Sequence, residues 1–264
     1  MAQFHLDSLA AKRRPKDIRE ALSHLPKSVP KMYDEIVARI LEQEEDDVNL
    51  AKQVLGWTIN AKRPLSIAEL QHAIAVGIDD EKIDELFEEA DLASVCCGLV
   101  TVDSLESRIR LIHYTAQEYF EGLADNKLSL SQATMAKTCL RYLGLVGSDG
   151  PCPYGERESW RTRLGIWKFC RYAAQFWADH ARGEAEGDSD LLGVLFSVLA
   201  CDKKKDSMLQ LQAEVERPHN NTPLFVKGQT WLHVVAANGL VTLIKRMLPS
   251  KEKGYDQYVH EVNI

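Results

Sequence analysis

The chain has 264 residues, of which 45% are hydrophobic and 27% are charged, and its formal net charge at pH 7 is −7. These proportions place it among globular proteins of one to three domains rather than among fibrous or disordered chains. No uninterrupted apolar segment near Met1 marks a secretory signal, and no later apolar run approaches the length that spans a bilayer. We therefore expect a cytoplasmic protein with no membrane partner.

The six cysteines form no Cys-x-x-Cys pair and have no His-x-x-x-His partner. We therefore expect neither a metal site nor a redox pair, and interpret them as buried or surface thiols in a reducing compartment. They are Cys96, Cys97, Cys139, Cys152, Cys170 and Cys201.

Residues 1–45 predict a helical segment. Apolar side chains recur at helical spacing from Leu6 to Leu41, and a proline-bounded turn at residues 25–30 divides the segment into two helices. The acidic run at residues 42–47 is interpreted as a solvated junction. The predicted apolar faces consist of Ile18, Leu22 and Leu25 in the first helix and Tyr33, Ile36, Ile40 and Leu41 in the second.

Residues 46–125 predict a winged helix, meaning three helices followed by a β-hairpin. The first helix covers Val48 to Asn60, and the second follows Pro64, with Ser66 and Glu69 as a capping box. Its predicted buried face is Ile67, Leu70, Ile74 and Ala75. The third is a long acidic helix from Asp79 to Gly98, with Ile83, Leu86, Phe87, Ala90 and Val95 on its apolar side.

After Gly98 the hydrophobic period changes from helical to extended. Residues 99–102 and 108–112 predict two strands joined by a turn, and the alternation in the second strand places its arginines on one side. The segment His113–Phe120 then leaves the hairpin and begins another helix.

Residues 126–217 predict a helical bridge. Helices are expected at Leu130–Val146, Leu164–Ala181, Leu191–Ala200 and Ser207–Val215, with a Gly/Pro-rich loop at residues 147–158. The aromatic side chains follow helical faces, so we interpret them as core rather than as a ligand cage. They are Trp167, Tyr172, Phe176 and Trp177.

Residues 218–264 predict a pair of short helices. Thr230 can cap the first helix, and Asn238-Gly239 ends it where a left-handed residue is needed. The expected apolar faces are Leu232, Val235 and Ala236, then Leu240, Leu243, Ile244, Met247 and Leu248 before Pro249. Such a pair cannot bury both faces alone, so it must stack on neighbouring elements.

This helix pair resembles an ankyrin repeat, whose core is G-x-T-P-L-H-x-A-A-x-x-G followed by a V-x-x-L-L helix. Thr230, His233 and Gly239 match its structural signature, whereas Trp231 replaces the proline and Val235 the first alanine. These departures favour a capping first repeat that starts a solenoid. Val262–Ile264 is similar to the start of the next repeat, so we expect the chain to be a fragment.

Motifs in the same order resemble fungal NACHT-ankyrin proteins, which are relatives of animal and plant nucleotide-binding immune receptors. The helical end of the NACHT NTPase module is matched by Phe4–Leu9, Pro15–Leu22, Leu25-Pro26 and Tyr33–Ile36. The winged helix that follows it is matched by Trp57, Arg63–Leu65, Glu69-Leu70, Cys97–Val100 and Ile112–Phe120, and the helical stretch before the repeats by Tyr172–Ala174, Phe176–Ala178 and His180-Ala181.

The resemblance implies a nucleotide-sensing residue. In this family the histidine of a His-x-Ser/Thr-x-x-Glu-Tyr/Phe segment contacts the diphosphate of bound ADP, and His113, Thr115 and Glu118 match it. ADP or ATP is thus implied for the full-length parent, and no cofactor for this fragment. The alternative is that His113 is satisfied at the end of a wing strand.

Charge argues against nucleic-acid binding, which is the common role of a winged helix. Asp46 to Asp125 contains 16 acidic and six basic residues. Phosphate-dominated binding requires the opposite sign. Nucleic-acid binding remains an alternative function only if a basic surface lies elsewhere in the chain, such as Lys12-Arg13-Arg14 with Lys16.

The chain contains no phosphate loop, no Gly-x-Gly-x-x-Gly, no Gly-x-Ser-x-Gly and no His-Glu-x-x-His. We expect no catalytic residue, although an enzyme with an unrecognised site stays a second alternative. The favoured hypothesis is a non-catalytic regulatory segment, in which an autoinhibitory winged helix contacts an intramolecular NACHT core. Ankyrin repeats would bind protein partners, and only the full-length parent would oligomerise.

Overall fold

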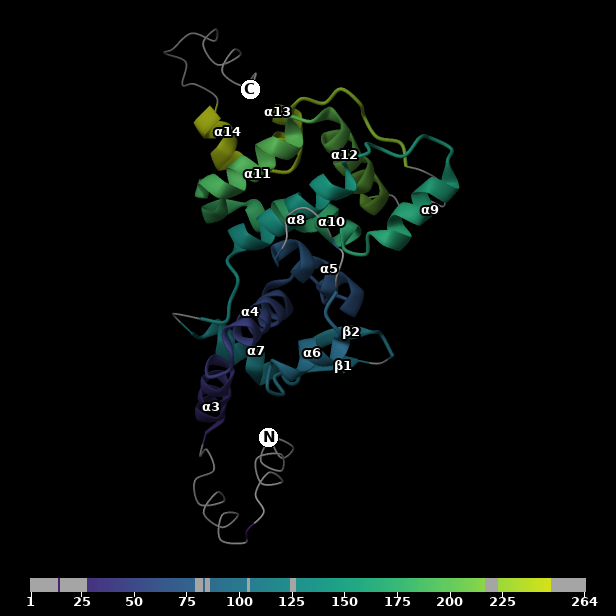
Figure 1. Cartoon of the computed structure of the whole chain (residues 1–264). Helices are drawn as coiled ribbons and strands as arrows, with labels where there is room; N and C mark the ends of the chain where they lie inside the picture. Colours follow the sequence, from purple (N-terminus) through teal and green to yellow (C-terminus); the bar gives the residue numbers. More distant parts are fainter. Residues whose placement is uncertain are drawn as a thin grey trace. The chain divides into compact units, whose positions relative to one another are not determined.

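The computed structural model describes residues 14, 28–78, 83, 86–103, 105–123, 127–216 and 223–247. In these residues the fold is mainly α, with one two-stranded sheet, as the sequence predicts (Figure 1). The chain divides into two compact units: Met1–Ile67 with Phe87–Ser129, and Ala68–Leu86 with Leu130–Ile264. The helix expected before the turn at residues 25–30, and the segment from Leu248 through Pro249 to Ile264, lie outside the described residues.

The first unit begins with two helices, α3 (Val29–Leu41) and α4 (Glu45–Asn60). Most of the predicted face of α3 is buried, but Leu41 is 37% exposed and Met32 is buried instead. Helix α4 starts at Glu45, three residues before the expected Val48, because the acidic residues of the preceding run form its first turn. Negative side chains are favourable there, since the free amides make a helix N-terminus electropositive.

The long acidic helix predicted from Asp79 to Gly98 is wrong in the described residues. Helix α6 covers only Glu89–Ser94, and residues 86–88 are not helical. A continuous helix would place Asp84 beside Glu88 and Glu85 beside Glu89, and like charges four residues apart are unfavourable. As a result, Leu86 is 43% exposed and Ala90 is exposed, while Val95 is buried as predicted.

The wing is an antiparallel hairpin of β1 (Val100–Asp103) and β2 (Arg108–Leu111), as predicted. Val102 pairs with Ile109, which is buried, whereas the arginines on either side of Ile109 are exposed. On the outer edge of β2, Ser66 forms an isolated antiparallel bridge with Arg108. Gly98 (φ 83°) provides the left-handed turn into β1, a conformation that costs glycine little. Helix α7 (Tyr114–Glu121) follows β2 directly.

The second unit is built around α8 (Gln132–Val146), which packs against three other helices. These are α10 (Cys170–Ala181), α11 (Ser189–Leu199) and α12 (Asp202–Glu216). A short 3-10 helix, η1 (Gly183–Gly187), joins α10 to α11. All but the first residue of α5 (Ile67–Ile78) also belongs to this unit, and its predicted face is buried.

The single helix predicted from Leu164 to Ala181 is two helices, α9 (Arg157–Ile166) and α10. At the break, the Phe169 amide donates to the hydroxyl of Tyr142 over 3.2 Å instead of continuing the helical pattern. The aromatic side chains do form the core of this unit, although Trp167 and Phe176 are only half-buried. The fully buried aromatic residues are Tyr142, Trp160, Phe169, Tyr172 and Trp177.

The C-terminal pair consists of α13 (Trp231–Ala237) and α14 (Val241–Met247), with Thr230 as the N-cap residue of α13. Gly239 between them has φ 69°, in agreement with the predicted left-handed turn. The predicted face of α13 is partly wrong, because Val234 and Val235 are buried whereas Ala236 is exposed.

None of the six cysteines forms a disulfide, and Cys96, Cys139, Cys152 and Cys170 are buried. Among the described residues, no group of three His, Cys, Asp or Glu side chains is arranged to hold a metal ion. None of the helices in the described part combines the length and the hydropathy that a membrane span requires.

Candidate functional site around His113

His113 is the N-cap residue of α7 and immediately follows the wing. Its backbone is extended (φ −156°, ψ 150°), which is typical of a helix cap. The first amides of a helix lack intrahelical acceptors, and the His113 ring supplies one, since its Nδ1 accepts from the Thr115 backbone N–H over 3.2 Å. The imidazole thus takes the place usually held by a serine or aspartate side chain.

Thr115 connects this cap to α3. Its hydroxyl oxygen lies 2.8 Å from His113 Nδ1 and 2.8 Å from the hydroxyl oxygen of Tyr33. Tyr33 is 2% exposed, whereas His113 is exposed. The site therefore runs from a buried phenol in α3 to an exposed imidazole at the start of α7.

Of the three residues matched to the family motif, the structure brings two together. His113 and Thr115 are hydrogen-bonded, as described. Glu118 lies one turn later on the exposed side of α7, and within the described residues no hydrogen bond joins its carboxylate to the other two.

The side chains next to His113 are apolar and exposed. Ile112 is 47% exposed and Tyr114 is 68% exposed. The Tyr114 ring lies against the imidazole, with a centroid distance of 4.4 Å. His113 is therefore a polar group in the middle of an exposed apolar strip.

A second contact between α3 and α7 was not predicted from the sequence. The phenol of Tyr119 donates to Asp34 Oδ1 over 2.6 Å, and its ring lies 5.1 Å from that of Tyr33. Burial and the Asp34 carboxylate raise the pKa of Tyr119. The sequence places Tyr33 on an apolar helix face and Tyr33-Asp34 in a family motif, but no sequence signal identifies their partners on α7.

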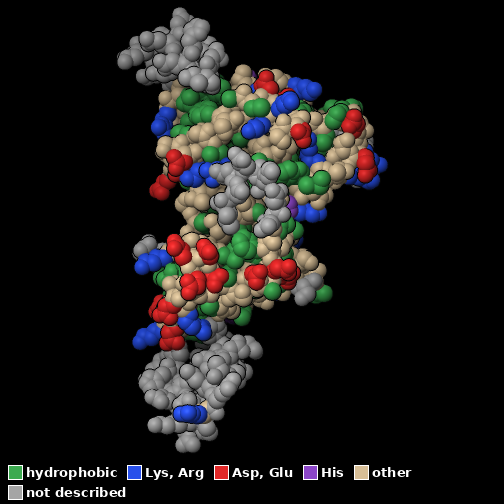
Figure 2. All heavy atoms as spheres, viewed as in Figure 1, with side chains coloured by type: hydrophobic (Ala, Val, Ile, Leu, Met, Phe, Trp, Pro, Cys, Tyr) green, Lys and Arg blue, Asp and Glu red, His purple; other side chains and the backbone are tan. Residues whose placement is uncertain are grey.

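The surface of the first unit is acidic, and Figure 2 shows carboxylates gathered over it. The α3–α4 junction exposes Glu42 and residues 44–47, and the start of α6 exposes Glu88, Glu89 and Asp91. Of the basic segment considered for nucleic-acid binding, Lys12, Arg13 and Lys16 lie outside the described residues. The described surface of the unit repels phosphate rather than attracting it.

The ankyrin-like signature forms a local cluster in the second unit. His233 Nδ1 accepts from the Thr230 backbone N–H over 3.2 Å and lies 2.7 Å from its hydroxyl oxygen. Gly239 lies beside the bridge, because a Cβ there would be in ordinary van der Waals contact with Arg182 Nε, at 3.4 Å. The three signature residues therefore act in the fold of the helix pair.

Polar side chains of the bridge hold this helix pair. Arg182 Nε donates to the Asn238 carbonyl over 3.0 Å, and Gln212 Nε2 donates to the Asn238 side chain over 2.9 Å. Glu186 of η1 is 4% exposed, and its Oε2 accepts from the Leu243 N–H over 2.7 Å. These hydrogen bonds attach the α13–α14 pair to the bridge.

The family comparison finds a match in the first part of the chain. Residues 40–131 match the model described as "GPI inositol-deacylase, winged helix domain". The match covers α4, the wing and α7, and therefore His113. It ends well before the ankyrin-like segment, and no solved structure matches the chain.

A curated protein that matches is "Vegetative incompatibility protein HET-E-1" of Podospora anserina, with 28% identity over 102 residues. The aligned part is 38% of this chain but only 7% of that protein's length. The two matches agree with the sequence motifs that resemble fungal NACHT proteins. They support a NACHT-associated winged helix in residues 40–131, while the ankyrin resemblance stays a prediction.

Proposed function

We propose that this chain is a non-catalytic regulatory and protein-interaction segment of a NACHT-ankyrin signalling NTPase. The winged-helix match, and the absence of phosphate-loop and nucleophile motifs from the sequence, support a segment that acts on a nucleotide-binding module rather than turning over a substrate itself. The acidic surface of the first unit favours this reading over nucleic-acid binding.

The observation that carries the proposal is the exposed imidazole of His113 between Ile112 and Tyr114. In the resting state of the full-length parent, this strip packs against the NACHT core and the imidazole contacts the diphosphate of ADP. The apolar neighbours exclude water from the contact, and a hydrogen bond is electrostatically stronger where water is excluded. When nucleotide exchange removes this contact, the winged helix is released from the NACHT core, so a change at one imidazole alters the arrangement of the whole protein.

The α13–α14 pair begins an ankyrin array that binds protein partners through several repeats. The His233–Thr230 hydrogen bonds and the left-handed Gly239 support this part of the proposal. The bridge residues that hold the pair would transmit movement between the switch and the array. The coupling itself is inferred from the family resemblance.

Replacement of His113 in the full-length parent tests the switch. The variant His113→Ala should retain less ADP after purification and elute as a larger species on a sizing column. Nucleotide is measured by chromatography of the acid-extracted protein. His233→Ala is the matched control, since it also removes an exposed imidazole whose Nδ1 accepts a backbone N–H. Unchanged ADP content and size in His113→Ala would remove His113 from the mechanism.

The isolated 264-residue chain should bind no nucleotide appreciably, because the proposed phosphate loop belongs to another part of the parent. Titration calorimetry with ATP and ADP measures this directly. Tight binding of either nucleotide would contradict the proposal.

A further inference from the structure

Two groups of Thr115 face Nδ1 of the His113 ring, the backbone amide and the side-chain hydroxyl, and together they set the protonation pattern of the ring. The amide donates to Nδ1 over 3.2 Å, and a backbone N–H can only donate. Nδ1 must therefore carry a lone pair. In the neutral imidazole the ring proton then resides on Nε2.

This assignment also determines the donor and acceptor roles of the Thr115 and Tyr33 hydroxyl groups. Thr115 Oγ1 lies 2.8 Å from Nδ1, and because Nδ1 is an acceptor, the Thr115 hydroxyl is the donor and shares the single Nδ1 lone pair with the backbone N–H. Its oxygen keeps free lone pairs and accepts from the Tyr33 hydroxyl over 2.8 Å. The hydrogen bonds thus run in one direction, from Tyr33 through Thr115 to His113.

The position of this relay is set by the packing of α3 on α7. Tyr33 is 2% exposed, and the next residue of α3, Asp34, accepts from Tyr119 over 2.6 Å. Thr115 and Tyr119 are four residues apart and lie on the same face of α7. Two adjacent residues of one helix therefore hold two successive turns of the other.

We propose that Tyr33 and Thr115 are positioning residues that hold the His113 ring with its Nε2–H directed away from Thr115, as a hydrogen-bond donor for an anionic oxygen. Such a donor fits a phosphate group better than the other tautomer, whose outer nitrogen would be an acceptor. The phosphate assignment rests on the proposed function, whereas the relay belongs to this chain alone. Separation of α3 from α7 removes the Tyr33 donor and loosens the ring.

Nuclear magnetic resonance of the 264-residue chain tests the relay without any nucleotide. A protonated and a bare imidazole nitrogen have distinct ¹⁵N shifts, and His113 is assigned by loss of its signals in His113→Gln. At a pH where the ring is neutral, folded wild type should show His113 only as the Nε2–H form. The same residue in the urea-unfolded chain supplies the reference mixture of tautomers. A folded wild-type spectrum with that same mixture would overturn the proposal.

Variants separate positioning from simple stabilisation. Thr115→Val should move the His113 shifts toward the unfolded mixture, and Tyr33→Phe should move them less, because Thr115 can still donate. Thr115→Ser should keep the wild-type shifts by retaining the hydroxyl. Tyr154→Phe, which removes the hydroxyl of an exposed tyrosine in the second unit, should also leave them unchanged. Equal shifts in Thr115→Val and Thr115→Ser would refute a role for the hydroxyl.

ADP retention by the full-length parent then distinguishes the two proposals. If the relay is correct and serves the switch, Thr115→Val should reduce ADP retention several-fold and Thr115→Ser should not. A confirmed relay with unchanged ADP in His113→Ala would leave the relay standing and end the nucleotide role. If wild type instead shows the unfolded-state tautomer mixture and His113→Ala retains less ADP, the relay is overturned and the nucleotide role of His113 stands.

Discussion

Tyr119 and Asp34 are 85 positions apart in the sequence, and a 2.6 Å hydrogen bond from phenol to carboxylate joins them. Tyr119→Phe removes this bond and leaves the rest of the ring. We expect the free energy of unfolding to fall by about 1 kcal/mol, the usual net value of one such hydrogen bond. Urea unfolding followed by circular dichroism measures the change.

The same pair predicts a pH dependence. Burial first, and then Asp34, raise the pKa of Tyr119 above its ordinary value of 10.0. The folded chain therefore keeps this proton at a pH where the unfolded chain loses it, so stability should decline as pH rises above about 10. The decline should be shallower in Tyr119→Phe. Tyr154, which is 72% exposed, provides the control, because Tyr154→Phe should keep the wild-type slope.

Glu186 caps α14 from outside the helix. Its Oε2 accepts from the Leu243 amide over 2.7 Å, and its Oε1 accepts from the Gly183 amide over 3.1 Å. Glu186→Ala leaves both donors without these acceptors, and we expect a loss of about 1–3 kcal/mol. The loss of stability should be concentrated in the α13–α14 pair. Hydrogen exchange at the Leu243 amide should accelerate more than exchange in α8.

Glu184 of the same 3-10 helix is the matched control for charge, because it is exposed. Glu184→Ala should leave exchange in α14 at the wild-type rate. Similar acceleration in both variants would show that the Glu186 contact does not hold the helix pair.

The sequence predicted elements whose signals are local. Alternation around Ile109 identified β2, and Asn238-Gly239 identified the end of α13, because each signal needs only neighbouring residues. The long acidic helix is a wrong prediction because the apolar spacing around Leu86 takes no account of the like charges that oppose a helix there. The break before α10 is absent from the prediction because the hydrogen bond at the break comes from the Tyr142 hydroxyl, on a helix elsewhere in the chain, which local spacing does not reveal.

The candidate site was only half predictable for the same reason. His113 was found through a family resemblance, and Thr115 was part of the same segment. Their partner Tyr33 is 82 positions from Thr115, and nothing in the spacing of the sequence connects the two. Tertiary packing of α3 on α7 determines that contact, so only the structure could identify it.

Gly147 is required by the close approach of two helices in the second unit. A Cβ at this position would lie 2.8 Å from the Cα of Lys204 and 3.1 Å from the Leu143 carbonyl oxygen. Backbone must move to admit it, and overpacking of this kind costs about 1–3 kcal/mol. Gly147→Ala should therefore lower the free energy of unfolding, as measured in urea.

Gly193 tests whether that loss comes from the contact or from glycine replacement in general. It lies in the interior of α11, is exposed, and has no heavy atom within 4 Å of an added Cβ. Gly193→Ala should stabilise the chain by about 0.5–1 kcal/mol, because alanine favours a helix. Destabilisation by both variants would contradict the close-packing explanation for Gly147.

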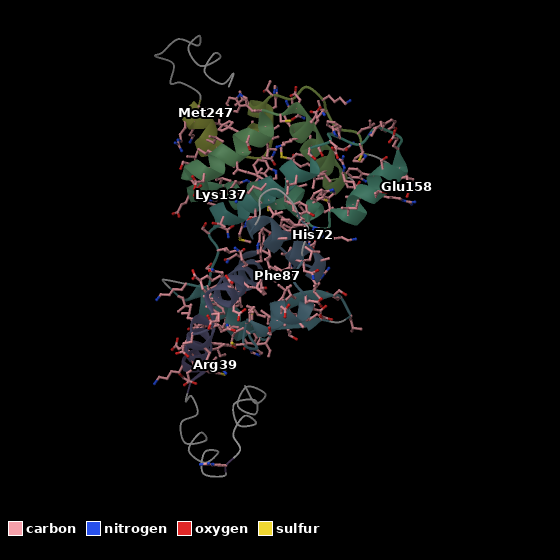
Figure 3. The ribbon with its side chains drawn as sticks, viewed as in Figure 1. Arg39, His72, Phe87, Lys137, Glu158 and Met247 are labelled. Atoms are coloured by element: carbon pink, nitrogen blue, oxygen red, sulfur yellow. The ribbon has the colours of Figure 1, made fainter. Side chains whose placement is uncertain are left out.

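His72 lies on α5 (Figure 3), and its surroundings predict that the second unit loses stability in acid. It is 8% exposed, and its Nδ1 lies 2.9 Å from the hydroxyl oxygen of Tyr142. Burial first, and then the charge of Lys168, lower the pKa of His72 from its ordinary 6.5. The unfolded chain thus binds this proton at a higher pH than the folded chain does. The resulting stability is present above about pH 6.5 and is lost as pH falls through the folded-state pKa.

His72→Gln isolates this effect, since glutamine can still form a hydrogen bond with the Tyr142 hydroxyl but does not titrate. Between pH 7.5 and pH 5, the free energy of unfolding of the wild type should fall relative to that of the variant. Urea unfolding at several pH values measures the difference, in which the contributions of the other seven histidines cancel because both proteins contain them. A constant difference across this range would mean that His72 takes up its proton equally in the folded and unfolded chains.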